Sequence, residues 1–226
     1  MQLALKISEL SFAWPGKNGF RLSIDNWQVQ AAKNVFLYGP SGSGKSTLLN
    51  LLSGVIPAQS GSIEVLAQEL TVLSARQRDR FRAKHIGMIF QQFNLLPYLS
   101  GEQNIQLAYH FNGKKNQLNS DYAQNLYEQL SLSDKLLQQQ ASTLSVGQQQ
   151  RIAVARALIS QPELIIADEP TSALDTQLRD SFVNLLLTNA TDSTVIFVSH
   201  DRSLVSLFDQ QYDIASLQTD LETKKC

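Results

Sequence analysis

Three observations on the sequence predict an α/β fold. Residues 39–47, G-P-S-G-S-G-K-S-T, fit the phosphate-binding pattern G-x-x-x-x-G-K-[ST] at every fixed position. A short apolar run at 35–38 predicts a buried strand before this loop, and residues 46–52 predict a helix after it. Two further apolar runs, 164–167 and 194–199, each lead directly into polar residues. Buried strands that end in this way are typical of a parallel sheet with a ligand at its carboxyl edge.

An aromatic pair near the amino terminus is a candidate for contact with a nucleobase. Residues 11–16 read S-F-A-W-P-G and lie upstream of the glycine-rich loop. The indole of Trp14 offers the largest flat face for stacking on a purine. Phe12 is two residues away, on the same side of an extended chain, and is the alternative. Either ring could instead belong to the core.

The loop at 39–47 has the chemistry that a phosphate requires. Its glycines allow the backbone to curl around an anion with N–H groups pointing inward. Lys45 adds a positive charge for the β- and γ-phosphates, and Ser46 offers a hydroxyl to Mg²⁺. The strand before and the helix after disfavour the alternative, a Gly/Ser-rich surface turn. The predicted nucleotide-binding residues are Gly39, Pro40, Ser41, Gly42, Ser43, Gly44, Lys45, Ser46 and Thr47.

Polar residues follow the other predicted strands. Gln91 follows the apolar run 86–90, and its amide could contact Mg²⁺ or an attacking water; its neighbour Gln92 is the alternative. Asp168 can organise Mg²⁺ through its water shell, and Glu169 can polarise a water that attacks the γ-phosphate. His200 can donate and accept hydrogen bonds near that phosphate. A solvated strand end is the alternative for the glutamines and the two carboxylates, and a structural histidine is the alternative for His200.

The stretch from 101 to 142 differs from the rest in its Gln, Asn, Leu and Ser content and in its helical spacing. We expect it to form a helical subdomain that extends to about residue 160. Residues 148–159 predict its last helix, and Ser145 and Gly147 lie at the start of that helix. A hydroxyl, free N–H groups and the positive end of the helix dipole favour an anion there, although an ordinary N-cap would look the same.

Residues 144–148, L-S-V-G-Q, resemble the signature of ATP-binding cassette (ABC) ATPases, which is usually LSGGQ. The other motifs of the family occur in the expected order, so that the resemblance covers about residues 3 to 217. The chain departs from the pattern at Val146, which replaces the first signature glycine. By this resemblance Trp14 is the A-loop aromatic, Gln91 the Q-loop glutamine and His200 the switch histidine. The signature is Leu144, Ser145, Val146, Gly147 and Gln148, and the D-loop is Ser172, Ala173, Leu174 and Asp175.

The resemblance implies a P-loop NTPase (RecA-like) core with an antiparallel β subdomain and an inserted α-helical subdomain. It also implies a homodimer in the ATP state, in which the signature of one chain contacts the γ-phosphate held by the other. Residues 86–97 and 144–151 are most similar to the bacterial macrolide-export and lipoprotein-release branch. ATP and Mg²⁺ are the expected ligands, with Ser46, Gln91 and Asp168 on the metal.

Composition agrees with one ABC ATPase domain over 1–226, ending in a polar tail at 218–226. The chain has 226 residues, 43% of them hydrophobic, and its net charge of −1 gives no basis for general binding to nucleic acid. Its one cysteine, Cys226, excludes an internal disulfide framework. No signal peptide is recognisable, and no apolar run approaches the ~18 residues of a membrane span.

The sequence therefore predicts the ATP-hydrolysing subunit of a bacterial ABC transporter or mechanotransmission complex. We expect it to be cytoplasmic and bound to the inner face of the membrane through a separate permease. Two alternatives stay open: a soluble ABC ATPase acting on nucleic acid or ribosomes, and a non-hydrolysing module gated by nucleotide. The first usually carries coiled-coil insertions or two fused cassettes, and intact Lys45, Glu169 and His200 disfavour the second.

Overall fold

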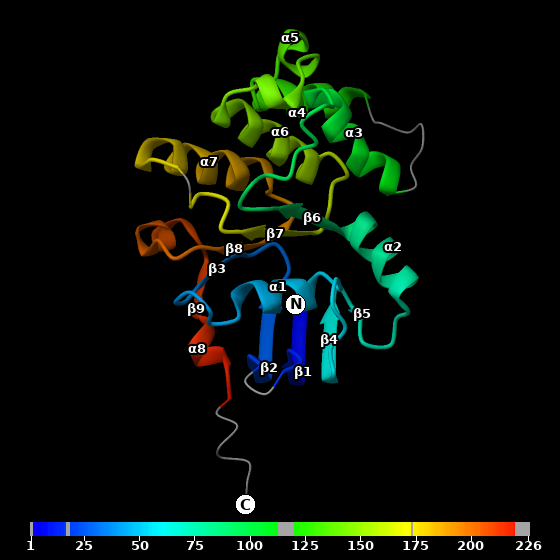
Figure 1. Cartoon of the computed structure of the whole chain (residues 1–226), viewed down its shortest axis with the longest axis vertical. Coiled ribbons are helices and arrows are strands. Elements are labelled where there is room, and N and C mark those ends of the chain that lie inside the picture. The colour runs from blue at the N-terminus through cyan, green and yellow to red at the C-terminus, as the bar shows by residue number, and fades with distance from the viewer. Residues whose placement is uncertain (1, 17–18, 113–119, 173, 220–226) are drawn as a thin grey trace, which may run out of the picture.

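The computed structural model describes residues 2–16, 19–112, 120–172 and 174–219, and it contains two β-sheets (Figure 1). The larger sheet is parallel, with strand order β6-β7-β8-β3-β9. Parallel neighbours must be joined by crossover connections, as the predicted α/β class requires. The strands are β3 (Asn34–Tyr38), β6 (Ile86–Ile89), β7 (Leu164–Asp168), β8 (Thr194–Val198) and β9 (Gln210–Asp213).

The smaller sheet is antiparallel, with strand order β2-β1-β4-β5. Its two long strands pair with Ile7 opposite Trp27, so that apolar residues of both strands share the buried face. Helix α1 (Lys45–Leu52) lies between the two sheets and contacts β4 and β7 (Figure 1). The strands are β1 (Leu3–Ala13), β2 (Arg21–Gln30), β4 (Ser60–Val65) and β5 (Gln68–Glu69).

Most of the helices cover the other face of the parallel sheet, at the top of Figure 1. Helix α6 packs against both α3 and α7. The predicted boundaries of the helical subdomain, 101 and 160, fall at the start of α3 and just after the end of α6; its status as a subdomain remains a prediction. The helices of this layer are α3 (Gly101–Phe111), α4 (Ser120–Gln129), α5 (Asp134–Leu137), η1 (Ala141–Thr143), α6 (Val146–Leu158) and α7 (Thr176–Asn189).

Near the carboxyl terminus, η2 (Arg202–Leu207) follows β8, and α8 (Ile214–Leu217) follows β9. The predicted polar tail at 218–226 lies mostly outside the described residues, which end at Thr219. Across the described part of the chain, none of the helices has the length and apolar character that a membrane crossing requires.

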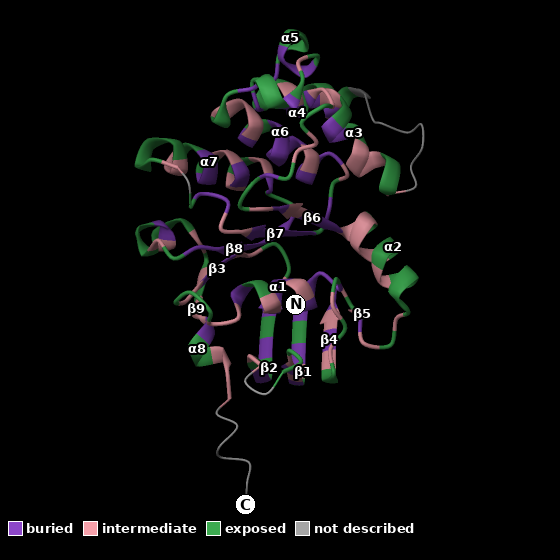
Figure 2. Ribbon diagram, viewed as in Figure 1, coloured by how far each residue is buried: buried purple, intermediate pink, exposed green. Residues whose placement is uncertain are grey.

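The parallel sheet separates two hydrophobic cores (Figure 2). Because side chains alternate along a strand, Phe36 and Phe197 face the helical layer, whereas Val35, Leu37 and Ile196 face α1 and the antiparallel sheet. Each fully buried side chain of this size contributes roughly 1.5–3 kcal/mol through burial. Because both faces of the sheet are packed, the polar residues at the ends of the central strands are held in fixed positions.

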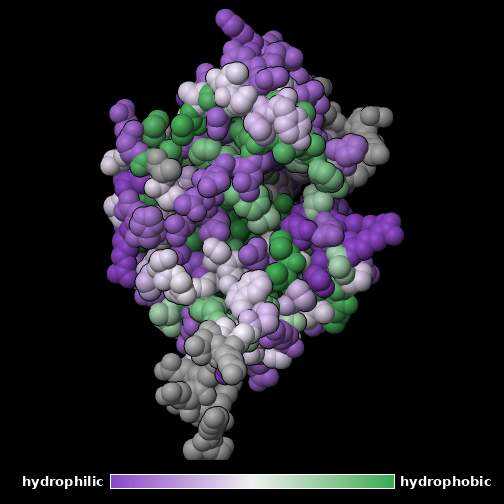
Figure 3. Space-filling model, in the orientation of Figure 1, coloured by the Kyte–Doolittle hydropathy of each residue, from purple (hydrophilic) through white to green (hydrophobic). Residues whose placement is uncertain are grey.

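Helix α2 (Ala75–His85) has no buried residue and forms a strongly hydrophilic flank of the molecule (Figure 3). Its inner arginines hold it in place. Arg78 donates to the carbonyls of Gly54 and Leu73, and Arg82 donates to that of Ser53. These carbonyls lie just beyond the end of α1 and before α2, so charge-assisted hydrogen bonds add to the packing of partly buried Phe81 against the core.

Candidate active site

The glycine-rich loop connects β3 to α1. The loop turns through left-handed backbone at Gly42 (φ 77°) and Gly44 (φ 95°), and Gly44 is the N-cap of α1. A side chain at Gly44 would overlap the ring of Phe20, so this position also requires glycine for space. The first N–H groups of a helix have no partner within it, and Lys45, Ser46 and Thr47 of the first turn of α1 line the cavity beside the loop. The local sequence therefore builds an anion site from the backbone.

Lys45 is buried inside this loop, with a relative exposure of 6%. Its ammonium donates to the carbonyls of Gly39 and Pro40, both at 2.9 Å, and lies 3.6 Å from a carboxylate oxygen of Glu169. A buried ammonium needs such partners, because desolvation of an unpaired charge is costly. The loop thus holds one positive charge at its centre.

Asp168 and Glu169 follow one another at the end of β7. Burial raises the pKa of Asp168, and a hydrogen bond from Ser46 opposes that rise. Glu169 has a left-handed backbone (φ 46°) and its N–H donates to Val198 at 3.0 Å. Its second carboxylate oxygen lies 3.4 Å from Nδ1 of His200. Glu169 therefore bridges the loop lysine and the predicted switch histidine, in a backbone conformation that costs free energy and is typical of functional sites.

A cavity of about 530 Å³ lies over these groups. Gln91 lines it, whereas its neighbour Gln92 does not. Trp14 lines it as well, 42% exposed, and its indole N–H donates to Thr47 at 3.1 Å. Phe12 is 6% exposed and packs edge-on against Trp14, with 5.2 Å between the ring centres. The lining residues are Trp14, Phe20, Ser41, Gly42, Gly44, Lys45, Ser46, Thr47, Gln91, Asp168 and Glu169.

The residues of this cavity fit a nucleotide and a magnesium ion. The loop supplies N–H groups and an ammonium, and the hydroxyl of Ser43 is buried without a hydrogen-bond partner. The hydroxyl of Ser46 and the carboxylate of Asp168 are in contact, and Gln91 faces the same cavity. Hydroxyl, amide and carboxylate oxygens are the ligands that Mg²⁺ prefers.

The signature residues lie elsewhere. Ser145 caps α6 by accepting from the N–H of Gln148 at 3.3 Å, and the Gln148 side chain accepts from the N–H of Ser145 at 2.9 Å. Val146 is 52% exposed, and a side chain built at Gly147 would meet nothing within 4 Å. Among the described residues that line the cavity, none comes from 144–148. One chain therefore does not bring its own signature to its own loop.

The D-loop connects the carboxylates to α7. The N–H of Ser172 donates to the carbonyl of Glu169 at 3.2 Å, and that of Leu174 to Thr171 at 3.2 Å. Asp175 caps α7 by accepting from the N–H of Leu178 at 2.9 Å. The predicted D-loop residue Ala173 lies outside the described residues. The segment thus leads from Asp168 and Glu169 directly into a helix.

Two contacts of the loop were not predicted. Phe20 lines the cavity and packs against Gly44, and the Gln218 side chain donates to the carbonyl of Ser43 at 2.8 Å. The aromatic character of Phe20, shortly after the Trp14 motif, was the one available signal. Gln218 gave none, because it is 175 residues from its partner.

A family model described as ABC transporter matches residues 22–172. The chain belongs to this family. The uncharacterized ABC transporter ATP-binding protein YbbA of Escherichia coli K12 is 39% identical over 184 residues, which cover 80% of each chain. The macrolide export ATP-binding/permease protein MacB of Burkholderia thailandensis is 40% identical over 179 residues, which cover 79% of this chain. MacB relatives confirm the predicted macrolide-export type of ABC ATPase.

The relatives differ in length. The aligned region covers only 27% of MacB. Another relative, the probable syringafactin export ATP-binding/permease protein SyfD of Pseudomonas syringae, is 39% identical over 191 residues, and the aligned region covers 29% of its length. Among solved structures, the dimeric post-hydrolysis cassette MJ0796 with ADP and Pi superimposes with a TM-score of 0.78 at 28% identity, over 92% of this chain and 93% of that one. These findings confirm the P-loop NTPase fold. They also identify the chain as an ATP-binding ABC ATPase.

Proposed function

We propose that this ABC ATPase is the motor subunit of a bacterial membrane complex. In this proposal it binds ATP with Mg²⁺, dimerises around the nucleotide and drives a separate permease from the cytoplasmic face of the membrane. Support comes from relatives named as export ATP-binding/permease proteins and from a similar cassette solved as a dimer. The permease would be another polypeptide.

The site geometry supports hydrolysis by the chain's own side chains. Lys45 binds the β- and γ-phosphates, and Glu169 accepts the proton of the attacking water. His200, on the far side of Glu169, orients that carboxylate and contacts the γ-phosphate. Ser46, Asp168 and Gln91 would hold Mg²⁺, which supplies charge neutralisation at the phosphates. This geometry disfavours a module that binds nucleotide without hydrolysing it.

The placement of the signature carries the proposal of a dimer. The start of α6 is exposed and capped by its own residues, and residues 144–148 do not reach the cavity of the same chain. A second copy, packed head to tail, would close the cavity with exposed Ser145 and partly exposed Gly147. ATP would then lie between the two chains and stabilise the dimer.

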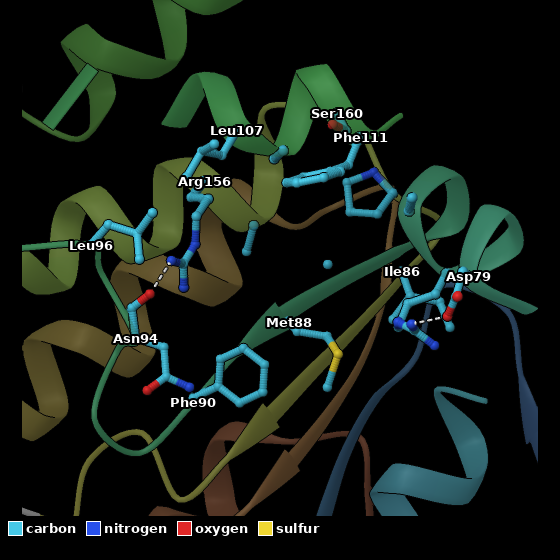
Figure 4. A pocket seen from close by; sticks show the side chains of 16 residues that line it. Asp79, Ile86, Met88, Phe90, Asn94, Leu96, Leu107, Phe111, Arg156 and Ser160 are labelled. Atoms are coloured by element: carbon cyan, nitrogen blue, oxygen red, sulfur yellow. Dashed lines mark hydrogen bonds and ion pairs between the residues drawn. The ribbon is translucent and has the colours of Figure 1, made fainter. Parts of the chain in front are cut away.

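A groove between α2, β6, α3 and α6 is our candidate for the permease contact (Figure 4). It has a volume of about 660 Å³. Arg156 lines one side of it and donates to the carbonyls of Phe93 and Asn94 at 2.5 and 2.7 Å. Phe111 points into it and is largely exposed. The larger apolar lining residues are Ile86, Met88, Phe90, Leu96, Leu107 and Phe111.

The groove and the nucleotide cavity share one short segment. Phe90 lines the groove, and the next residue, Gln91, lines the cavity. A permease segment that moves Phe90 would therefore also move Gln91. This adjacency favours a cytoplasmic segment of the permease as the occupant of the groove. It would couple ATP hydrolysis at the cavity to movement of the membrane protein.

Light scattering after size-exclusion chromatography tests the dimer. Glu169→Gln removes the general base but keeps the shape of the side chain, so ATP should accumulate and the variant should dimerise when ATP is added. Ser145→Arg in the same background places bulk and charge at the exposed helix start and should prevent dimerisation. An undiminished ATP-dependent dimer in the double variant would refute the role of the signature.

A further inference from the structure

Arg179, on the first turns of α7, contacts two carboxylates from different elements. Its Nε donates to Asp180 at 2.8 Å, on its own helix, and its Nη1 contacts Asp201, on the turn after β8. The arginine side chain is 14% exposed. Arg179 thus joins α7 to the residue that directly follows His200.

Asp201 is itself fixed by its surroundings. One carboxylate oxygen accepts from the N–H of Ser203 at 3.0 Å and from its hydroxyl at 2.7 Å, which caps η2. The other oxygen faces Arg179, and the N–H of Asp201 donates to the hydroxyl of buried Ser199 at 3.1 Å. The backbone on both sides of His200 is therefore anchored to β8 and α7.

His200 is less firmly held than its neighbours. Its side chain is 62% exposed, and its contact with Glu169 is long, at 3.4 Å. An exposed imidazole with one weak contact takes its position from the backbone that carries it. The geometry of that backbone depends on Asp201, and through Asp201 on Arg179.

The other end of this connection is the D-loop. Asp175 caps α7, and its carbonyl accepts from the N–H of Arg179 at 2.9 Å. Arg179 therefore lies one helical turn beyond the D-loop. A shift of the D-loop would move the start of α7, and with it the guanidinium that holds the turn after His200.

We propose that Arg179 is a positioning residue for ATP hydrolysis, because its guanidinium clamps the turn of His200 to the helix that follows the D-loop. The inference rests on the proposed role of His200. Arg179 does not line the nucleotide cavity, so its loss should affect the rate and not the binding of ATP.

Steady-state ATPase measurements on the full chain give the first test. Arg179→Ala should lower kcat by roughly 10–100-fold, the effect expected of a small displacement of a reacting group, with KM for ATP changed less than about twofold. Arg179→Lys should recover part of the rate, since an ammonium can still reach Asp201. Arg202→Ala is the matched control: it removes an arginine from the turn that follows His200, where Arg202 contacts Tyr38 and Asp213, and should stay within about twofold of wild type.

A double-mutant cycle separates positioning from a general structural role. If Arg179 acts through His200, then Arg179→Ala should have almost no further effect on kcat in a His200→Ala background. If each substitution instead lowers kcat by the same factor alone and in the double variant, the inference is overturned, while the role of His200 is left intact. A His200→Ala variant with a wild-type rate would instead refute the proposed role of His200.

An NMR measurement without nucleotide gives an independent readout. The chain has three histidines, His85, His110 and His200, so that His200→Ala assigns the imidazole signals. Arg179→Ala should shift the His200 signal and leave the other two unchanged. Arg202→Ala removes an equal charge from a residue that is closer to His200 in the sequence, and it should shift the His200 signal less. A shift no larger than that of the control would contradict the clamp.

Discussion

The starts of α1 and α6 are both assigned to phosphate binding, but they are built in different ways. The start of α1 follows Gly44, which has no capping side chain, and it encloses a buried lysine. The start of α6 satisfies two N–H groups, those of Ser145 and Gln148, through the reciprocal bonds of these residues, and Ser145 and Val146 are exposed. The first depends on contacts within the chain. The start of α6 borders open space, which in the proposed dimer is filled by the partner.

This difference shows that two motifs of similar chemistry can have different requirements. The α1 loop is held by distant parts of its own chain, from Glu169 to Gln218. Changes there should therefore alter both nucleotide binding and the local structure. Changes at the α6 start should alter the stability of the isolated chain only slightly and act mainly on the dimer. The four substitutions below test this contrast, from the largest expected effect to the smallest.

Lys45→Ala should nearly abolish ATP binding. Hydrogen bonds to charged groups contribute about 1.5–3 kcal/mol each, so losing those to the phosphates should weaken binding by at least roughly 100-fold. Equilibrium binding of labelled ATP measures this. Lys33→Ala removes a surface lysine, paired with Asp209 at 3.7 Å, and serves as the control. Near-wild-type affinity in folded Lys45→Ala protein would overturn the assignment of the loop.

Gly147→Asp should separate stability from activity. An acidic residue in the first turn of a helix is favourable by roughly 0.3–1 kcal/mol, and the space beside Gly147 is open, so the isolated chain should unfold at an unchanged or higher denaturant concentration. The same charge would face the γ-phosphate of the partner, and ATPase activity should fall by about 100-fold. Gly147→Ala should have a much smaller effect. If activity is retained in Gly147→Asp, the α6 start does not face phosphate.

Trp14→Ala should weaken ATP binding by about 1–3 kcal/mol through loss of base stacking. Phe12→Ala should act mainly on folding, because removal of a buried phenylalanine typically costs about 3–5 kcal/mol of stability. ATP titrations and denaturant unfolding on both variants separate the two effects. A larger loss of affinity in folded Phe12→Ala would show that the A-loop aromatic is Phe12.

Val146→Gly, which restores the usual signature residue, should change little. The valine side chain is exposed and caps nothing, so ATPase activity should remain within about twofold. Glycine in a helix costs roughly 0.5–1 kcal/mol, and a small loss of stability is expected. A large gain in activity would mean that the valine obstructs the partner's nucleotide.

The sequence predicted the elements that carry local signals. The glycine spacing, the apolar run 35–38 and the paired carboxylates placed the loop at the carboxyl edge of a parallel sheet, where the structure has it. The antiparallel β subdomain came only from the family resemblance, because its strands lack a distinctive motif, whereas the composition and helical spacing of residues 101–142 had already predicted helices there. The roles assigned to the site residues remain predictions.

Contacts between residues that are distant in the sequence could not be predicted from local sequence patterns. The bond from Gln218 to the loop, the packing of Phe20 on Gly44 and the ion pair of Arg179 with Asp201 join residues that are distant in sequence. The left-handed backbone of Glu169 was also not foreseen, since glutamate has no preference for positive φ. Such features arise from tertiary packing that no single segment encodes.

The positions of the two tryptophans give the protein a built-in optical reporter. The chain has only Trp14 and Trp27. Trp27 is buried against Tyr212 and should emit as a constant background, whereas the indole of Trp14 borders the nucleotide cavity. A purine that covers this indole would change its solvent exposure and hence its fluorescence. Nucleotide binding and release would then change the fluorescence of the unlabelled chain, so that both could be followed without an assay for released phosphate.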